Sequence, residues 1–163
     1  MVGTPLVINY DEYRADKSQK GKEYEDFVCE YLAKQIGLVI TVFSSKKYQY
    51  NKGETLQGVE IKYDMRYGET GNLYIEVGEK AKPRNGCYFP SGILREDNTW
   101  LYIIGNYKEI FVFGKKHLKA VYESKRYYRL IENNGTETST GFLLTKEQAN
   151  RYCMAKYNIE NTN

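Results

Sequence analysis

The 163-residue chain has little cysteine and no long apolar run. Its three cysteines, Cys29, Cys87 and Cys153, are far apart and form no CxxC pair. Neither a zinc site nor a disulfide framework is therefore expected, and reduced thiols fit a cytoplasmic location. No apolar stretch approaches the roughly 20 residues of a membrane helix, and the N-terminus lacks a basic-then-apolar signal pattern. We expect a soluble, cytoplasmic protein that does not enter a membrane.

Histidine and excess charge are also scarce. His117 is the only histidine, so a His–Cys nucleophilic mechanism has little support, and a surface position near a helix start is expected for it. The formal net charge of +3 is smaller than is usual for a dedicated non-specific nucleic-acid binder. Local basic clusters matter more, and those in loops and turns could touch phosphate or simply be solvated.

Tyrosine, in contrast, is abundant, with 17 residues. Most of these rings are expected in half-buried strands and in the core, although tyrosine also stacks on bases. The length suits one domain, residues 1–163.

Hydrophobic periodicity predicts an α+β domain in which an N-terminal helix is followed by a β-meander in a mixed sheet flanked by helices. After an arm or short strand over residues 1–16, the first helix is expected over residues 18–36 and a strand over 38–43. Thr145 with Gln148 forms a capping box that starts a last helix, expected to reach about residue 157. The remaining elements are a helix over residues 115–124 and strands over 58–63, 73–77, 99–104, 109–113, 127–131 and 141–144.

Acidic residues recur on two of these strands. Side chains alternate along a strand, so Glu60 and Lys62 share one face, and Glu76 takes the polar face of the strand over 73–77. If the two strands pair with their apolar faces aligned, these three residues lie together. Clustered carboxylates suit Mg²⁺, and a neighbouring lysine can orient water or offset transition-state charge in phosphodiester hydrolysis. Periodicity alone equally describes the solvated face of a half-exposed sheet.

The ordered set of motifs resembles the PD-(D/E)XK nuclease superfamily, the restriction-endonuclease-like fold, and in particular its small phage-type and resolvase-like members. The segment 21–28, Gly-Lys-Glu-Tyr-Glu-Asp-Phe-Val, resembles the family's opening helix with its glutamate, here Glu25. Glu60 in Gly-Val-Glu-Ile-Lys and Glu76 in Tyr-Ile-Glu-Val resemble the two strand acids. The resemblance covers residues 18–122 and leaves 125–163 as a C-terminal extension.

This resemblance implies an Mg²⁺- or Mn²⁺-dependent endonuclease acting on nucleic acid, with DNA expected, and a homodimer because two sites are needed to cut two strands. Glu25, Glu60 and Glu76 would be the metal ligands, with Glu23 as an alternative to Glu25. The family's lysine is absent two residues after Glu76, where Gly78 stands. Lys62 is the preferred replacement, to act on the attacking water.

Several alternatives to this assignment stay open. Lys80 could take the lysine's place, or Glu60-Ile-Lys62 could itself be the acid-x-Lys motif, with Glu76 and Asp64 in other roles. Asp64 could also join the metal shell or start a turn. A catalytically inactive DNA-binding or protein-interaction module on the same fold is the alternative function.

Five further residues flank the expected site in sequence and are candidate phosphate contacts. A solvated surface, or a turn for the serine, is the alternative for each: Lys46, Lys47, Lys82, Arg84 and Ser91.

Overall fold

The computed structural model describes residues 10–84, 86–132 and 138–159. Its elements in chain order are α1 (Tyr10–Ile36), α2 (Lys46–Lys52), β1 (Val59–Tyr63), α3 (Tyr67–Thr70), β2 (Asn72–Glu79), β3 (Phe89–Pro90), η1 (Gly92–Leu94), β4 (Leu101–Gly105), β5 (Glu109–Gly114), α4 (Lys115–Glu123), β6 (Arg129–Ile131), β7 (Ser139–Thr145), α5 (Lys146–Tyr152) and β8 (Ala155–Asn158). The α+β class is confirmed. No described helix is long and apolar enough to cross a membrane.

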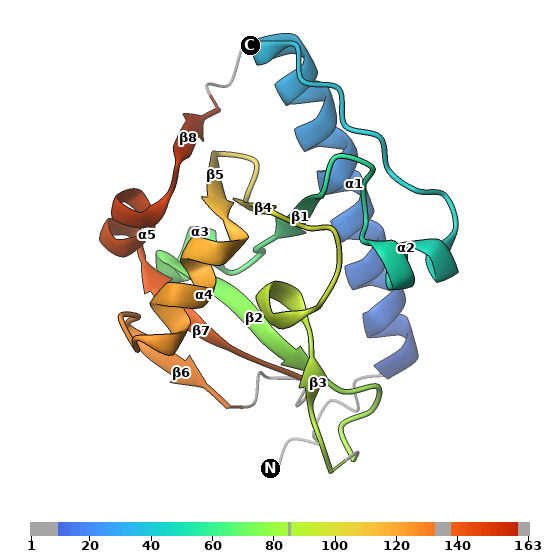
Figure 1. Cartoon of the computed structure of the whole chain (residues 1–163), viewed down its shortest axis with the longest axis vertical. Coiled ribbons are helices and arrows are strands. Elements are labelled where there is room, and N and C mark those ends of the chain that lie inside the picture. The colour runs from blue at the N-terminus through green and yellow to red at the C-terminus, as the bar shows by residue number, and fades with distance from the viewer. Residues whose placement is uncertain (1–9, 85, 133–137, 160–163) are drawn as a thin grey trace, which may run out of the picture.

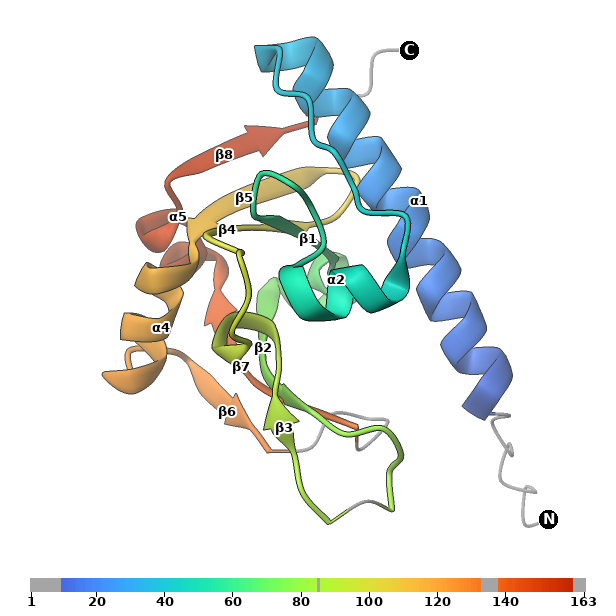
Figure 2. The same ribbon diagram turned by 45° about the vertical axis from the view of Figure 1, so that its right-hand side comes forward.

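Two four-stranded sheets build the molecule. The first has the order β1-β4-β5-β8 and is mixed, because β1 runs parallel to β4 while the other pairs are antiparallel. The second has the order β3-β2-β7-β6 and is antiparallel throughout. Helix α1 runs along one side of the molecule, and α4 and α5 lie on the other (Figures 1 and 2).

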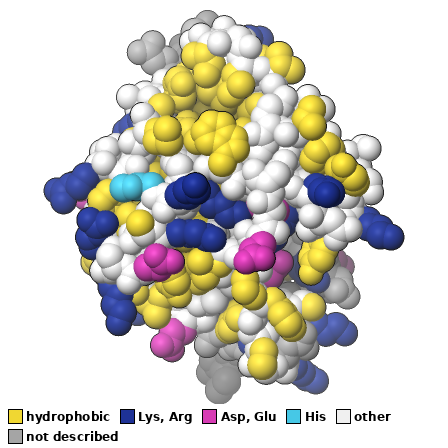
Figure 3. All heavy atoms as spheres, viewed as in Figure 1, with side chains coloured by type: hydrophobic (Ala, Val, Ile, Leu, Met, Phe, Trp, Pro, Cys, Tyr) yellow, Lys and Arg dark blue, Asp and Glu magenta, His cyan; other side chains and the backbone are white. Residues whose placement is uncertain are grey.

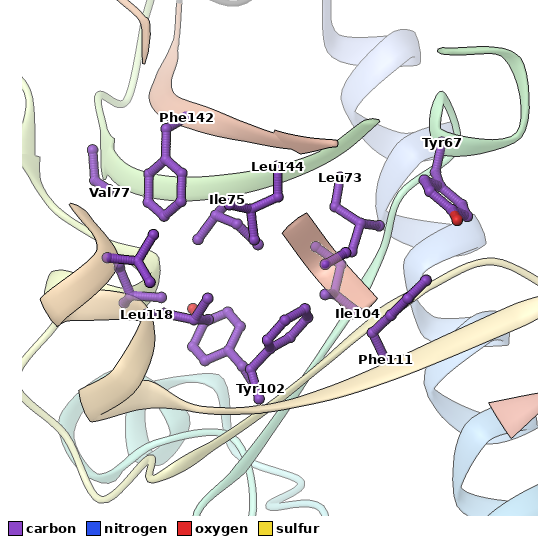
Figure 4. Close-up of a cluster of buried hydrophobic side chains, with 14 residues drawn as sticks. Tyr67, Leu73, Ile75, Val77, Tyr102, Ile104, Phe111, Leu118, Phe142 and Leu144 are labelled. Carbon is purple, nitrogen blue, oxygen red and sulfur yellow. The ribbon is translucent and has the colours of Figure 1, made fainter. Parts of the chain in front are cut away.

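Two hydrophobic cores hold these layers. The larger one fills the space between the sheets, where Ile75 and Phe142 of the second sheet face Tyr102 and Phe111 of the first (Figure 4). The smaller one packs Tyr24, Val28 and Leu32 of α1 against the opposite face of the first sheet. The first sheet is therefore covered on both faces, which explains why β4 is so apolar.

The expected pairing of the two acidic strands is wrong. β1 pairs with β4 and β2 pairs with β7, so the two strands belong to different sheets. The connection between them turns around Asp64, whose carboxylate accepts hydrogen bonds from the backbone N–H groups of Arg66, Tyr67 and Tyr74. This turn and α3 carry the chain from one sheet to the next instead of closing a hairpin, and no β-meander forms there.

Three element boundaries also differ from expectation. Helix α1 begins at Tyr10, well before residue 18. The apolar run 38–43 forms no strand, only a bridge between Val42 and Thr55, because the Gln57 side chain binds the Thr41 N–H and the Val39 carbonyl where a neighbouring strand would. The capping box of α5 is confirmed, but that helix ends at Tyr152 and the chain continues as β8, which completes the first sheet.

Several other elements agree with the sequence-based expectation, whereas α2, α3, β3 and η1 were not expected. The hairpin of β4 and β5, helix α4 and the pair β6–β7 are confirmed. The segment Asn133-Asn134-Gly135, where a turn between the strands over 127–131 and 141–144 is predicted, and most of the N-terminal arm lie outside the described residues.

Candidate active site

Glu60 is the buried centre of the candidate site. On β1 the side chains alternate, so Val59 and Ile61 face α1 while Glu60 faces the opposite side of the sheet. There it lies next to Tyr102, its register partner on β4. The exposed fraction is 2% for Glu60 and 1% for Tyr102. A buried carboxylate is costly unless charges or hydrogen bonds compensate it, so its partners define the site.

Lys62 supplies the main compensation. Its Nζ lies 2.8 Å from Glu60 Oε1 and 3.1 Å from Glu54 Oε1. Burial lowers the pKa of Lys62, but the negative charges of Glu54 and Glu60 outweigh burial and hold that pKa well above its usual value. Lys62 is therefore a protonated ammonium held between two carboxylates.

Two buried oxygens at this site complete no hydrogen bond of ordinary geometry among the described residues. They are Glu60 Oε2 and the hydroxyl of Tyr102. The two groups interact with each other: burial, then the negative charge of Glu60 and a hydrogen bond to Glu60, raise the pKa of Tyr102 well above its usual value. Buried polar atoms nearly always have partners, and here the tyrosine hydroxyl and the carboxylate serve each other, so a bound ion would compete with Tyr102 for Glu60.

Glu76 is held rigidly on β2 by two hydroxyl groups. Ser91 donates to Oε1 at 2.6 Å and Ser139 donates to Oε2 at 2.9 Å. Ser91 reaches this position because Gly92 adopts a φ of +52° and passes so close to β2 that a Cβ would lie 2.3 Å from the Glu76 carbonyl oxygen. Both carboxylate oxygens of Glu76 are thus oriented by neighbours.

The structure brings Glu60, Lys62 and Glu76 into one electrostatic neighbourhood even though their strands do not pair. The charge of Glu76 raises the pKa of Lys62 and of Tyr102. Glu25 of α1 lies at the side of this group: burial and then repulsion from Glu54 raise its pKa, while the charges of Lys62 and Lys46 lower it. The acids and the lysine come from α1, the segment before β1, β1 and β2.

Position 78, where the resemblance implies a lysine, leaves no free space for a side chain. A Cβ on Gly78 would lie 2.9 Å from Thr140 Cγ2 and 3.3 Å from the Phe89 carbonyl oxygen. Lys80 lies over the Tyr88 ring, with its Nζ 4.8 Å from the ring centroid. Lys62 is the lysine that the structure places against Glu60.

The other predicted residues take separate positions. Asp64 caps the turn before α3, and the Ser91 hydroxyl donates to Glu76. Lys82 and Arg84 are exposed in the loop that joins β2 and β3, and His117 is exposed on α4, where it is visible in Figure 3. Lys46 and Lys47 are exposed on α2.

Sequence reasoning missed three members of the site, Glu54, Tyr102 and Ser139. Glu54 stands in a polar segment and Tyr102 in an apolar strand, so neither carried a motif. The roles of Tyr102 and Ser139 depend on the parallel register of β1 with β4 and on the pairing of β2 with β7, which bring distant segments together.

The described residues contain no group of three or more His, Cys, Asp or Glu side chains placed to hold a metal ion. Glu60 and Glu76 are nevertheless donors of the type that a magnesium-type ion takes, since such an ion uses one or two carboxylates and completes its shell with water and substrate phosphate. The carboxylate of Glu76 is oriented by its two serine partners.

A separate depression of about 440 Å³ lies away from these acids. Its lining includes Tyr63, Tyr67, Tyr107, Lys108 and Lys146. Glu109, which also lines it, is neutralised by Lys146 and Lys156 at 3.0 and 2.6 Å. None of the predicted catalytic residues contributes to this depression.

The comparisons with known proteins add no assignment. No protein-family model matches the chain, and no curated protein and no solved structure matches it.

Proposed function

We propose that this chain is a metal-dependent nuclease that hydrolyses phosphodiester bonds, with DNA as the expected substrate and a restriction-endonuclease-like site. The observation that carries the proposal is Glu60, a carboxylate that is 2% exposed, with one oxygen on Lys62 and with the charge of a second carboxylate, Glu76, acting on the same lysine. Burying a carboxylate is costly, and Lys62 and the Tyr102 hydroxyl compensate it. Buried titratable groups gathered in this way are typical of functional sites, and carboxylates are ligands that a divalent cation prefers.

Each residue then has a definite role. Glu60 and Glu76 would hold the divalent ion, and Glu25 stays a candidate at the edge of the site. The bound ion supplies Lewis-acid polarisation of phosphate and a more acidic water. Ser91 and Ser139 fix the orientation of Glu76, which is the usual task of residues that contact a metal ligand.

Lys62 acts as a positively charged hydrogen-bond donor and not as a base. Because the pKa of Lys62 is well above its usual value, the ammonium keeps its proton at neutral pH. It can donate hydrogen bonds to a phosphate oxygen or to the attacking water, and it offsets the negative charge that grows in the transition state. Proton removal from that water falls to a carboxylate or to solvent.

A cleavage assay with matched variants tests the proposal. Circular and linear DNA are incubated with the protein and Mg²⁺ or Mn²⁺, and with Glu60→Gln, Glu76→Ala and the control Glu79→Gln. Glu79 is exposed on the same strand as Glu76. We expect cleavage by the wild type and by the control, and a loss of roughly a hundredfold or more in both site variants. Absence of cleavage by the wild type with either ion would contradict the nuclease function.

A catalytically inactive DNA-binding module is the second candidate, and Gly78 favours it. The family's lysine position cannot be filled without moving Thr140, and Lys62 is already paired with two carboxylates. In the same assay this candidate predicts intact DNA together with retained DNA binding in a mobility-shift experiment. A protein-interaction module would give neither cleavage nor a shift, even at low salt.

A further inference from the structure

Helix α2 carries an unusual concentration of positive charge. Its seven residues, Lys-Lys-Tyr-Gln-Tyr-Asn-Lys, include three lysines and no acid, and none of its side chains is buried. Lys46 and Lys47 stand in the first turn, where the helix dipole disfavours cations. Lysines at these positions lower the stability of the helix, so stability does not explain their presence. Binding of a polyanionic ligand does.

The helix is nevertheless held firmly in place. Ser45 caps its start by accepting from the Tyr48 N–H. Gln49, on the inner side, donates its amide to the Phe43 carbonyl, and Arg95 donates to the Gln49 carbonyl at 2.8 Å. With Gln49 fixed on the inside, the lysines and tyrosines face solvent as an ordered platform.

Exposed aromatic rings accompany these lysines. The exposed fraction is 74% for Tyr50 and 57% for Trp100. Trp100 belongs to the loop that packs on the end of α2, where Asn98 donates from its backbone N–H to the Lys52 carbonyl. Lysine and hydrophobic side chains are both visible on the right-hand side of Figure 3, where Figure 1 places α2. Rings beside lysines are what proteins use to stack unpaired bases while they bind the phosphates.

The platform adjoins the candidate active site. Lys46 acts on Glu25, lowering its pKa, and Glu54, two residues beyond α2, accepts from Lys62. Helix α2 and the carboxylates are therefore neighbours on the molecule.

We propose that α2 and Trp100 form the docking platform for single-stranded DNA, with Tyr50 stacking an unpaired base and Lys46, Lys47 and Lys52 binding phosphates. A duplex offers no free base face to Tyr50, so the platform selects substrates that are single-stranded next to the scissile bond. The inference rests on the proposed function in taking DNA as the substrate, and it names the form of DNA.

Binding without divalent ions tests this platform separately from cleavage. Fluorescence anisotropy in EDTA is measured with a labelled 20-nucleotide strand and with its duplex, at several salt concentrations. We expect Tyr50→Ala to weaken single-strand binding roughly tenfold, Tyr50→Phe to keep it, and duplex binding to change less than about twofold. Lys47→Ala should weaken binding of both and lower the salt slope for the single strand by about 0.7.

Tyr128→Ala is the matched control, because that tyrosine is 60% exposed beside β6, away from α2. The platform is contradicted if Tyr50→Ala and Tyr128→Ala weaken single-strand binding equally. It is also contradicted if Tyr50→Ala weakens binding of the single strand and of the duplex equally. If DNA is cleaved but neither binding nor cleavage depends on Tyr50, the platform is contradicted and the nuclease function is supported. If binding depends on Tyr50 but no DNA is cleaved, the platform is supported and the nuclease function is contradicted. Circular dichroism of each variant verifies folding.

Discussion

At the residue scale, Glu60 and Lys62 form one ion pair but contribute differently to the stability of the fold. Lys62 has a second acid, Glu54, whereas among the described residues Glu60 pairs with no cation other than Lys62. Removing the lysine therefore leaves a buried charge uncompensated, whereas neutralising the glutamate does not. The two members of one ion pair should respond differently to substitution.

We expect Lys62→Ala to lower the free energy of unfolding by about 2–3 kcal/mol, less than for a fully buried pair because the Lys62 side chain is 38% exposed, and Glu60→Gln to change it by about 1 kcal/mol or less. In the double variant the loss caused by Lys62→Ala should shrink, because no carboxylate remains at position 60. Urea unfolding of the four proteins gives the coupling energy directly. Equal losses in the two single variants would contradict the pairing described here.

At the element scale, the approach of η1 to β2 positions Glu76. Gly92 combines a φ of +52° with a Cβ position that falls on the Glu76 backbone, while Gly71 has a φ of +67° and open space around it. Both glycines need a positive φ, but only Gly92 lies so close to a neighbouring backbone that a Cβ would collide with it. Comparing them isolates the effect of displacing Ser91 from Glu76.

Gly71→Ala should cost about 1 kcal/mol of stability, the ordinary price of a left-handed alanine, and leave DNA cleavage unchanged. Gly92→Ala should cost clearly more and also lower the cleavage rate, because η1 must move and Ser91 with it. Thermal unfolding and the plasmid assay measure the two effects. Equal behaviour of the two variants would show that the η1 contact does not support the site.

At the scale of the whole molecule, Glu109 ties the two sheets together. It stands on β5 of the first sheet, binds Lys156 on β8 at 2.6 Å, and also binds Lys146 of α5, the helix that follows β7 of the second sheet. The Tyr67 hydroxyl donates to it at 2.7 Å from α3. Partial burial raises the pKa of Glu109, but these hydrogen bonds outweigh burial and lower that pKa to about 2.

This depressed pKa makes the contribution of Glu109 dependent on pH. Its folded-state pKa lies below the ordinary 4.5, so its stabilisation is complete above pH 4.5 and is lost as the pH falls toward 2. At pH 7 we expect Glu109→Gln to lower the free energy of unfolding by about 2 kcal/mol, and the difference from wild type to decrease steadily below pH 4.5 and to be small at pH 2.5. Thermal unfolding from pH 7 to pH 2.5 measures this; Glu123→Gln, at an exposed position of α4, is the control. A difference that is constant with pH would contradict the role of Glu109.

Local pattern was sufficient for much of the fold. The β4–β5 hairpin, α4 and the β6–β7 pair follow from periodicity, and the start of α5 follows from Thr145 and Gln148, because each depends on residues close in the chain. The strand expected over 38–43 failed because a side chain, Gln57, took the place of a neighbouring strand. No local pattern contains that information.

For the candidate site, the sequence by itself determined the acids: Glu60 and Glu76 stand at the polar positions of two strands whose alternation is fixed by the backbone. Only the tertiary structure decided that these strands lie in different sheets, that Glu54 and Tyr102 join Glu60, and that Lys62 is the lysine beside it. The physical reason is that alternation sets which face a side chain takes, whereas the partner across that face is set by packing between segments far apart in the chain.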